Sequence, residues 1–148
     1  MIEDLLTRSA VRELVDRYAV EVDRHDGDAV AALFVPDGRL ELHRDGIGRP
    51  VTSVVAGGDA IAAAIDGLAR YRVTTHLVGQ HLVDLVDGDV ATGVAYCLAH
   101  HVGAEGDPSA NRVDSIRYLD DYVRTDDGWR FVRRRLSFDW SEVRTVLV

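Results

Sequence analysis

The first 24 residues alternate apolar and polar positions with the period of an α-helix. The apolar positions recur every three or four residues: Val11, Leu14, Val15, Tyr18, Ala19 and Val22. Charged residues fill the positions between them, so the pattern predicts an amphipathic helix over residues 2–24. Tyr18 lies in the predicted buried stripe. Asp23 borders that stripe near the end of the helix, where a carboxylate opposes the helix dipole. The alternative for Asp23 is a solvated side chain in a frayed last turn.

Two shorter helices are expected over residues 29–34 and 60–70, each behind a turn rich in Gly and Asp. A turn at Pro36-Asp37-Gly38 is expected to separate the first of these helices from a strand over residues 39–43. Residues 51–56 have the pattern of a short edge strand.

The second half of the chain reads as two long β-hairpins. Val, Thr and Leu are frequent over residues 71–102, which are interrupted by a tight-turn signal at Asp87-Gly88. A second hairpin is expected over residues 111–140 around Asp126-Asp127-Gly128, and residues 141–148 are expected to form a tail. Helices followed by long antiparallel strands predict one α+β domain over residues 1–148, with helices on one face of the sheet. Strands this long usually need bulges to curl around a cavity.

The first hairpin brings two histidines together. A turn centred on Asp87-Gly88 places His76 opposite Ala99, with His101 one diagonal step away. Alternation puts these three residues on one face, which they share with the small residues Gly93, Ala95 and Cys97. That face has room for a ligand. Strict alternation puts His81 and His100 on the opposite face, although one bulge would exchange His100 for His101.

Composition excludes several classes of protein. The chain has 148 residues, of which 47% are hydrophobic, and this is enough for one packed domain. A net charge of -8 argues against nucleic acid or an anionic membrane as the partner. No apolar run has the ~20 residues that span a bilayer. The single cysteine excludes an internal disulfide, and the start of the chain lacks the order of a signal peptide, so a cytoplasmic location is expected.

The residue types also limit the chemistry. All 17 basic residues are arginine, which excludes a lysine Schiff base and the lysine of a phosphate-binding loop. No second ligand pair completes a tetrahedral metal site around the histidines, so neither a metal nor a cofactor is expected. No serine lies in a nucleophile elbow. The pair His76 and His101 is suited to acid–base chemistry, and the alternative is two histidines hydrogen-bonded in an ordinary sheet.

Arg117 is a further candidate. It alternates in phase with Val113, Ser115 and Leu119. If that phase faces the cavity, its guanidinium would stabilise an enolate or carboxylate oxygen. The alternative is a surface ion pair with one of the many acidic residues.

Five short motifs, taken in order, carry a resemblance to a known family: Tyr18-x-x-x-x-Asp23-x-x-Asp26, Thr75-His76-x-x-Gly79, Leu98-Ala99-His100-His101, Arg117-Tyr118-x-Asp120 and Asp127-Gly128-Trp129-Arg130. Over nearly the whole chain they resemble the SnoaL-like branch of the nuclear-transport-factor-2-like superfamily. The nearest enzymes by motif are scytalone dehydratase and the bile acid 7α-dehydratases. The resemblance implies a cone in which a curved antiparallel sheet surrounds a pocket covered by three N-terminal helices.

The resemblance also implies site residues. In the related dehydratases a Tyr and an Asp of the first helix meet a His, which corresponds here to Tyr18, Asp23 and His76. His101 matches the second histidine of scytalone dehydratase, and Arg117 falls where the bile acid enzymes have an arginine. Val22, rather than a tyrosine, precedes Asp23. This difference from scytalone dehydratase argues against the phenolic substrate of that enzyme.

The hypothesis that follows is a cofactor-free lyase or isomerase acting on a small, mostly apolar cyclic carbonyl compound. His76, held by Asp23, would remove a proton alpha to the carbonyl, and Tyr18 and Arg117 would stabilise the oxyanion. His76 or His101 would protonate the departing hydroxyl, and elimination of water is favoured over isomerisation. The alternatives are a non-catalytic binding or assembly domain, a polyketide cyclase and the small subunit of a ring-hydroxylating dioxygenase. Fold alone does not decide among them.

Assembly can be predicted from the other face of the first hairpin. Val94, Tyr96 and Leu98 form an apolar stripe there, and helices cannot cover both faces of the sheet. Because an exposed apolar patch usually marks a partner surface, we expect a homodimer through this outer face.

Overall fold

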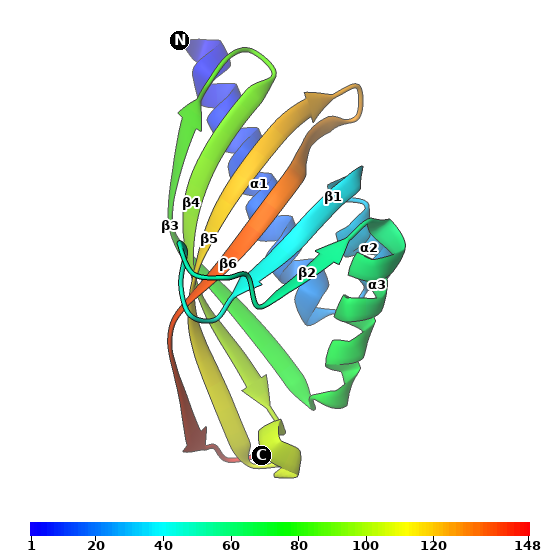
Figure 1. The fold of residues 1–148 in the computed structure, drawn as a ribbon, viewed down its shortest axis with the longest axis vertical. Coiled ribbons are helices and arrows are strands. Elements are labelled where there is room, and N and C mark those ends of the chain that lie inside the picture. The colour runs from blue at the N-terminus through cyan, green and yellow to red at the C-terminus, as the bar shows by residue number, and fades with distance from the viewer.

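A curved six-stranded sheet with helices against one face makes up the protein (Figure 1). The computed structural model describes all residues from 1 to 148. The strands are β1 (Phe34–His43), β2 (Ser53–Ala56), β3 (Val73–Leu85), β4 (Val90–Val102), β5 (Ala110–Thr125) and β6 (Gly128–Thr145). The helices are α1 (Ile2–Asp23), α2 (Gly27–Ala31) and α3 (Gly58–Asp66), and short 3-10 turns are formed by Gly67–Arg70 and Ala104–Gly106. The predicted α+β class is confirmed.

The sheet has the order β2-β1-β6-β5-β4-β3. All neighbouring strands are antiparallel except β1 and β6, which run parallel. The three α-helices precede the two long hairpins, with β1 and β2 lying between α2 and α3. No helix combines the length and the apolar character that crossing a bilayer requires.

The inner stripe of α1 forms one side of the core. All six apolar residues of the predicted stripe are buried. They pack against the inner faces of the strands, where the small residues Ala91, Ala95 and Ala99 of β4 leave room for the helix. α1 ends at Asp23, and His25 then turns the chain with a left-handed φ of 56°. The burial of α1 therefore carries Tyr18 and Asp23 to the inner face of the sheet.

The register of the β3–β4 hairpin agrees with the prediction at the histidines, but only because two shifts in register cancel each other. His76 pairs with Ala99, as expected. The turn itself is one residue longer than predicted, because Leu85 pairs with Ala91. A bulge in β3 between Val78 and His81 then shifts the register back by one residue. The two offsets cancel on the side of the bulge that carries His76.

The same bulge makes one sequence prediction wrong. Strict alternation placed His81 on the face opposite His76. Beyond the bulge, however, His81 pairs with Ala95, and its Nε2 lies 3.3 Å from the buried hydroxyl of Tyr122. The extra residue inverts the phase of the strand, so His81 faces inward, away from the His76 end.

Two further predictions about elements are wrong. Pro36–Gly38, predicted as a turn, lies inside β1, where the parallel pairing with β6 absorbs it as a break in register between Phe34 and Arg39. Residues 141–145, predicted as part of a tail, continue β6 and pair with the start of β5. Residues 110–114 of β5 supply backbone partners to this extension, and the hydrophobic pattern of the tail did not reveal them.

Candidate active site

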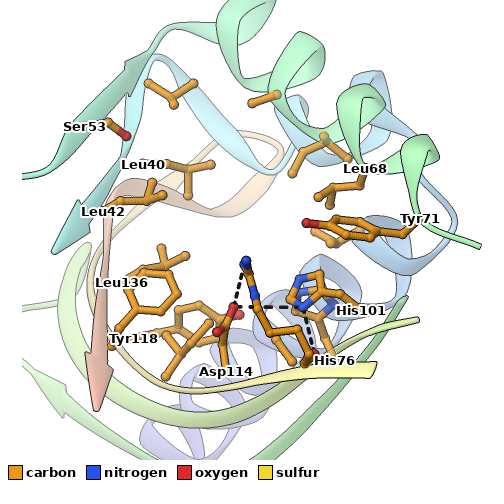
Figure 2. A pocket seen from close by; sticks show the side chains of 18 of the residues that line it. Leu40, Leu42, Ser53, Leu68, Tyr71, His76, His101, Asp114, Tyr118 and Leu136 are labelled. Carbon is orange, nitrogen blue, oxygen red and sulfur yellow. Dashed lines mark hydrogen bonds and ion pairs between the residues drawn. The ribbon is translucent and has the colours of Figure 1, made fainter. Parts of the chain in front are cut away.

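A cavity of about 230 Å³ lies between the inner face of the sheet and the segment that contains α3. Of its 21 lining residues, 14 are hydrophobic. Figure 2 shows His76, His101 and Asp114 gathered at one end, with Leu40, Leu42 and Leu136 lining the opposite wall. A few polar groups that converge in an apolar pocket are typical of a small-molecule site.

Asp23 and His76 are in direct contact. The Nδ1 of His76 lies 2.7 Å from the Oδ1 of Asp23, and the backbone N–H of His76 donates to Oδ2 at 2.9 Å. Because a carboxylate can only accept, Nδ1 carries the proton, and in the neutral imidazole Nε2 is then the nitrogen with the lone pair. Only 9% of the His76 side chain is exposed, and His76 lines the cavity. Asp23 therefore holds the tautomer that a general base needs.

A second hydrogen-bond chain supports the Asp23 carboxylate. Thr74 Oγ1 donates to Asp23 Oδ1 at 3.0 Å and accepts from His25 Nε2 at 3.2 Å. Burial by itself raises the pKa of Asp23, but the hydrogen bonds from His76 and Thr74 outweigh burial and leave the pKa below its ordinary value. Asp23 is thus a stable anion beside His76. Sequence reasoning missed Thr74 and His25, since only the tertiary fold brings them to the end of α1.

His101 lies in the cavity beside His76, whereas His100 lies on the other face. The two imidazole rings of His76 and His101 are 5.9 Å apart between centroids. His101 Nδ1 donates to the carbonyl oxygen of Arg112 at 3.3 Å, so its Nε2 is an acceptor. Burial, with the nearby His76, lowers the pKa of His101 to about 4. His101 is therefore neutral at pH 7. His100 instead contacts Asn111, with 3.0 Å between the His100 Nδ1 and the Asn111 Nδ2.

Acidification is expected to destabilise the protein through His101. The pKa of His101 is about 4 in the folded state, against an ordinary value of 6.5, so the unfolded chain binds the additional proton first as the pH falls. The stabilisation is complete above about pH 6.5 and is lost toward pH 4, by up to about 3 kcal/mol. Urea unfolding at about pH 7 and about pH 4.5 measures the loss. His101→Gln, which cannot titrate, should lose much less, and an equal loss in both proteins would contradict the assignment.

Tyr18 lies at the floor of the cavity, among aromatic rings. Its centroid is 5.9 Å from that of Tyr118 and 5.8 Å from that of Phe131. Burial raises the pKa of Tyr18 to about 12, so the phenol keeps its proton at neutral pH. Tyr18 therefore lines the cavity from the buried stripe of α1 and carries a protonated phenol.

The prediction that Arg117 lines the cavity is wrong. Its side chain is 49% exposed on the outer face, where it donates to Asp139 at 2.8 Å and lies over the ring of Tyr96. The cavity phase of β5 is the other one, which carries Ile116 and Tyr118. Arg117 instead forms a surface ion pair with Asp139, which was the alternative for this residue.

Arg112 and Asp114 line the cavity instead. Arg112 pairs with His101 across β4 and β5, and its Nη2 lies 3.1 Å from the Oδ2 of Asp114. Asp114 is buried and also accepts from Ser141 in the extension of β6. Both residues are paired with cavity-facing residues of β4, Arg112 with His101 and Asp114 with Ala99. The sequence alone does not give this register, because it depends on the path of the loop over residues 103–109. No cluster of three or more His, Cys, Asp or Glu side chains is arranged to hold a metal ion.

Known proteins are similar to this chain over most of its length. An uncharacterized protein of Mycobacterium tuberculosis is 28% identical over 134 residues, which cover 90% of this chain and 86% of the relative. A solved Mycobacterium tuberculosis protein of unknown function is 30% identical, with a TM-score of 0.77 over 93% of this chain and 74% of its own. A provisionally assigned scytalone dehydratase from Novosphingobium aromaticivorans is 24% identical, with a TM-score of 0.81 over 99% of this chain and 93% of its own.

The family is decided by a match over most of the chain. The SnoaL-like domain model matches residues 3–135, a span that includes nearly all of α1, the whole β3–β4 hairpin and the polar cavity residues described above. The chain belongs to the SnoaL-like domain family, in the nuclear-transport-factor-2-like superfamily.

Proposed function

We propose that the protein is a cofactor-free lyase that eliminates water from a small, mostly apolar carbonyl compound with a hydroxyl group beta to the carbonyl. The contact that carries the proposal is the 2.7 Å hydrogen bond between Asp23 and His76. It fixes the protonated nitrogen of His76 on the side of α1 and leaves the basic nitrogen free. A general base held in this way is suited to removing a proton from carbon.

The proposed reaction needs no group beyond the chain and its substrate. His76 Nε2 takes the proton alpha to the carbonyl, and the electrons of the C–H bond form an enolate. Tyr18 donates a hydrogen bond to the enolate oxygen, and the guanidinium of Arg112 takes the electrostatic role that the sequence had suggested for Arg117. As the enolate collapses, a C=C bond forms, the C–O bond breaks, and the protonated His76 returns its proton to the departing hydroxide. Water and a conjugated carbonyl compound result.

The electrostatics of the two histidines support different roles for His76 and His101. His101, with a pKa of about 4, carries no proton on its Nε2 at neutral pH, and its Nδ1–H is bonded to the Arg112 carbonyl, so His76 is assigned both proton transfers. Neutral His101 can accept a hydrogen bond from the substrate hydroxyl through its Nε2. Tyr71, whose ring centroid lies 5.0 Å from that of His101, closes the same end of the cavity (Figure 2).

A substrate screen tests the proposal directly. β-Hydroxy ketones with one or two rings are incubated with the protein, and ultraviolet absorbance reports new conjugation. Turnover that slows when the alpha hydrogen is replaced by deuterium would support proton removal by the protein. If ligands of this panel bind and raise the melting temperature without turnover, the cavity is a binding site and the lyase proposal is wrong.

We further propose that the protein forms a homodimer through the outer face of β3 and β4. Val94, Tyr96 and Leu98 are 36–38% exposed there, and Leu77 and Leu82 beside them are 62% and 75% exposed. Light scattering at micromolar concentration should give twice the mass of one chain, and Leu98→Glu should give a monomer. Leu147→Glu, in the exposed C-terminal segment, is the matched control and should remain dimeric. A monomer mass for the unmodified protein would overturn the dimer.

A further inference from the structure

The cavity has the opposite charge balance to the rest of the chain. Over the whole protein 25 acidic residues outnumber 17 arginines. The cavity, in contrast, is lined by the three arginines Arg44, Arg70 and Arg112 and by a single carboxylate, that of Asp114. Asp114 is already bonded to Arg112 and Ser141. Two guanidiniums at the cavity therefore have no counter-charge within it.

Arg44 is an exposed residue that lines the cavity without an acidic partner. It follows β1, and its guanidinium carbon lies 4.4 Å from the centre of the Phe138 ring, which also lines the cavity. None of the ion pairs of the protein includes Arg44 or Arg70. A stacked guanidinium keeps its N–H edge available for an anion, because stacking uses only the face of the group.

Arg70 is held in a similar way on the wall that carries Tyr71. Its guanidinium carbon lies 4.5 Å from the centre of the Tyr71 ring. Its Nη1 donates to the carbonyl of Gly67 at 2.8 Å, and its Nη2 donates to the Tyr71 hydroxyl at 3.2 Å. These contacts orient the side chain but do not neutralise it. The positive charge is thus positioned beside the residue that closes the His101 end of the cavity.

We propose that the ligand of this cavity carries a carboxylate, which Arg44 and Arg70 bind while the apolar walls hold the body of the molecule. That this ligand is also the reacting molecule rests on the proposed function, whereas its binding does not. A guanidinium presents paired N–H groups that match a carboxylate. No glycine lines the cavity, and the chain has no lysine, so the backbone cradle and lysine typical of phosphate sites are missing. The substrate class is accordingly a cyclic carbonyl acid.

Isothermal titration calorimetry with three probes tests the assignment: 1-naphthoate, 1-naphthamide and 1-naphthyl phosphate. We expect 1-naphthoate to bind at least ~10-fold more tightly than the amide, the size of one charged hydrogen bond. Arg44→Gln and Arg70→Gln should each remove most of this preference and leave the affinity for the amide within ~2-fold, since the apolar contacts remain. The preference should also shrink as sodium chloride is added.

Arg49→Gln is the matched control, because Arg49 is exposed in the loop after Arg44 and does not line the cavity. It should retain the preference for 1-naphthoate. Equal binding of acid and amide, binding of neither, tighter binding of the phosphate ester, or an unchanged preference in both cavity variants would overturn the assignment. His76→Asn separates the two proposals. It should keep the carboxylate preference, so a failed lyase assay with an intact preference refutes the reaction and leaves the ligand class standing.

Discussion

Replacing His76 by asparagine is expected to lower turnover by about 10²–10⁴-fold while the fold and ligand binding persist. The asparagine amide can donate to Asp23 in place of Nδ1–H, so the carboxylate keeps a partner. What the variant lacks is the basic nitrogen that faces the cavity. In terms of the barrier the loss is roughly 3–5 kcal/mol. Measurement of kcat on a substrate found in the screen tests the loss of turnover, and the melting temperature tests whether the fold persists.

Two comparisons make this result specific. His100→Asn, on the outer face of the same hairpin, should leave kcat unchanged. Asp23→Asn should lower kcat because His76 loses the anion that fixes its tautomer, and adding Asp23→Asn to His76→Asn should cost little more. If His76→Asn and Asp23→Asn both lower the melting temperature and no substrate is found, the pair is structural, and the cavity belongs to a binding module.

The second large effect concerns a buried ion pair beneath the cavity. Arg134 and Asp120 are both fully buried and share two hydrogen bonds of 2.9 Å. The guanidinium carbon of Arg134 also lies 3.8 Å from the centre of the Tyr118 ring and 4.3 Å from that of Tyr18. Burial alone would lower the pKa of Arg134, but the Asp120 carboxylate outweighs burial and raises it. The pair is therefore charged, and each partner depends on the other.

Asp120→Asn is expected to destabilise the protein by about 3–5 kcal/mol, because it leaves the Arg134 charge buried without a counter-ion. It also removes the charged acceptor of the Tyr122 hydroxyl, now 2.8 Å away. The free energy of unfolding in urea, followed by circular dichroism, measures the loss. The double variant Asp120→Leu with Arg134→Met should be more stable than Asp120→Asn, since apolar groups of similar volume often replace a buried pair at little cost.

The exposed pair of Arg117 and Asp139 is the matched control for this experiment. Its donor–acceptor distance of 2.8 Å is as short as those of the buried pair, but the two side chains are 49% and 34% exposed. Asp139→Asn should therefore change the free energy of unfolding by less than about 1 kcal/mol. A similar loss for Asp120→Asn and Asp139→Asn would contradict the view that burial, and not distance, decides the cost.

Local pattern was sufficient for the elements that are strongly periodic. The stripe of α1 predicted its buried side and placed Tyr18 within it, and the position of Asp23 at the end of the stripe followed from the same period. The alternation in β4 predicted a face of small residues with His101, and Val94 and Leu98 are on the other face as expected. These predictions succeeded because one face of each element is clearly less polar or smaller than the other.

Local pattern was not sufficient for the charged strands. Alternation divides the residues of a strand into two faces but does not show which face lies against the core. In β5 both phases carry charged and apolar residues, so Arg117 and Arg112 were equally eligible by pattern. The pairing of His101 with Arg112 decides the phase, and that pairing is set by the path of the chain through residues 103–109. The bulge that turns His81 inward is likewise a property of two strands together.

The sequence by itself therefore determined the fold class and the order of the elements, and its resemblance to the SnoaL-like family supplied Tyr18, Asp23, His76 and His101 as candidate site residues. Tertiary structure alone decided that Asp23 and His76 are 2.7 Å apart, and that Arg112 rather than Arg117 lines the cavity. The physical reason is the range of the interactions. Hydrophobic periodicity is local and can be read within one element, whereas register, ion pairing and the charge of a cavity depend on residues that only the folded chain brings together.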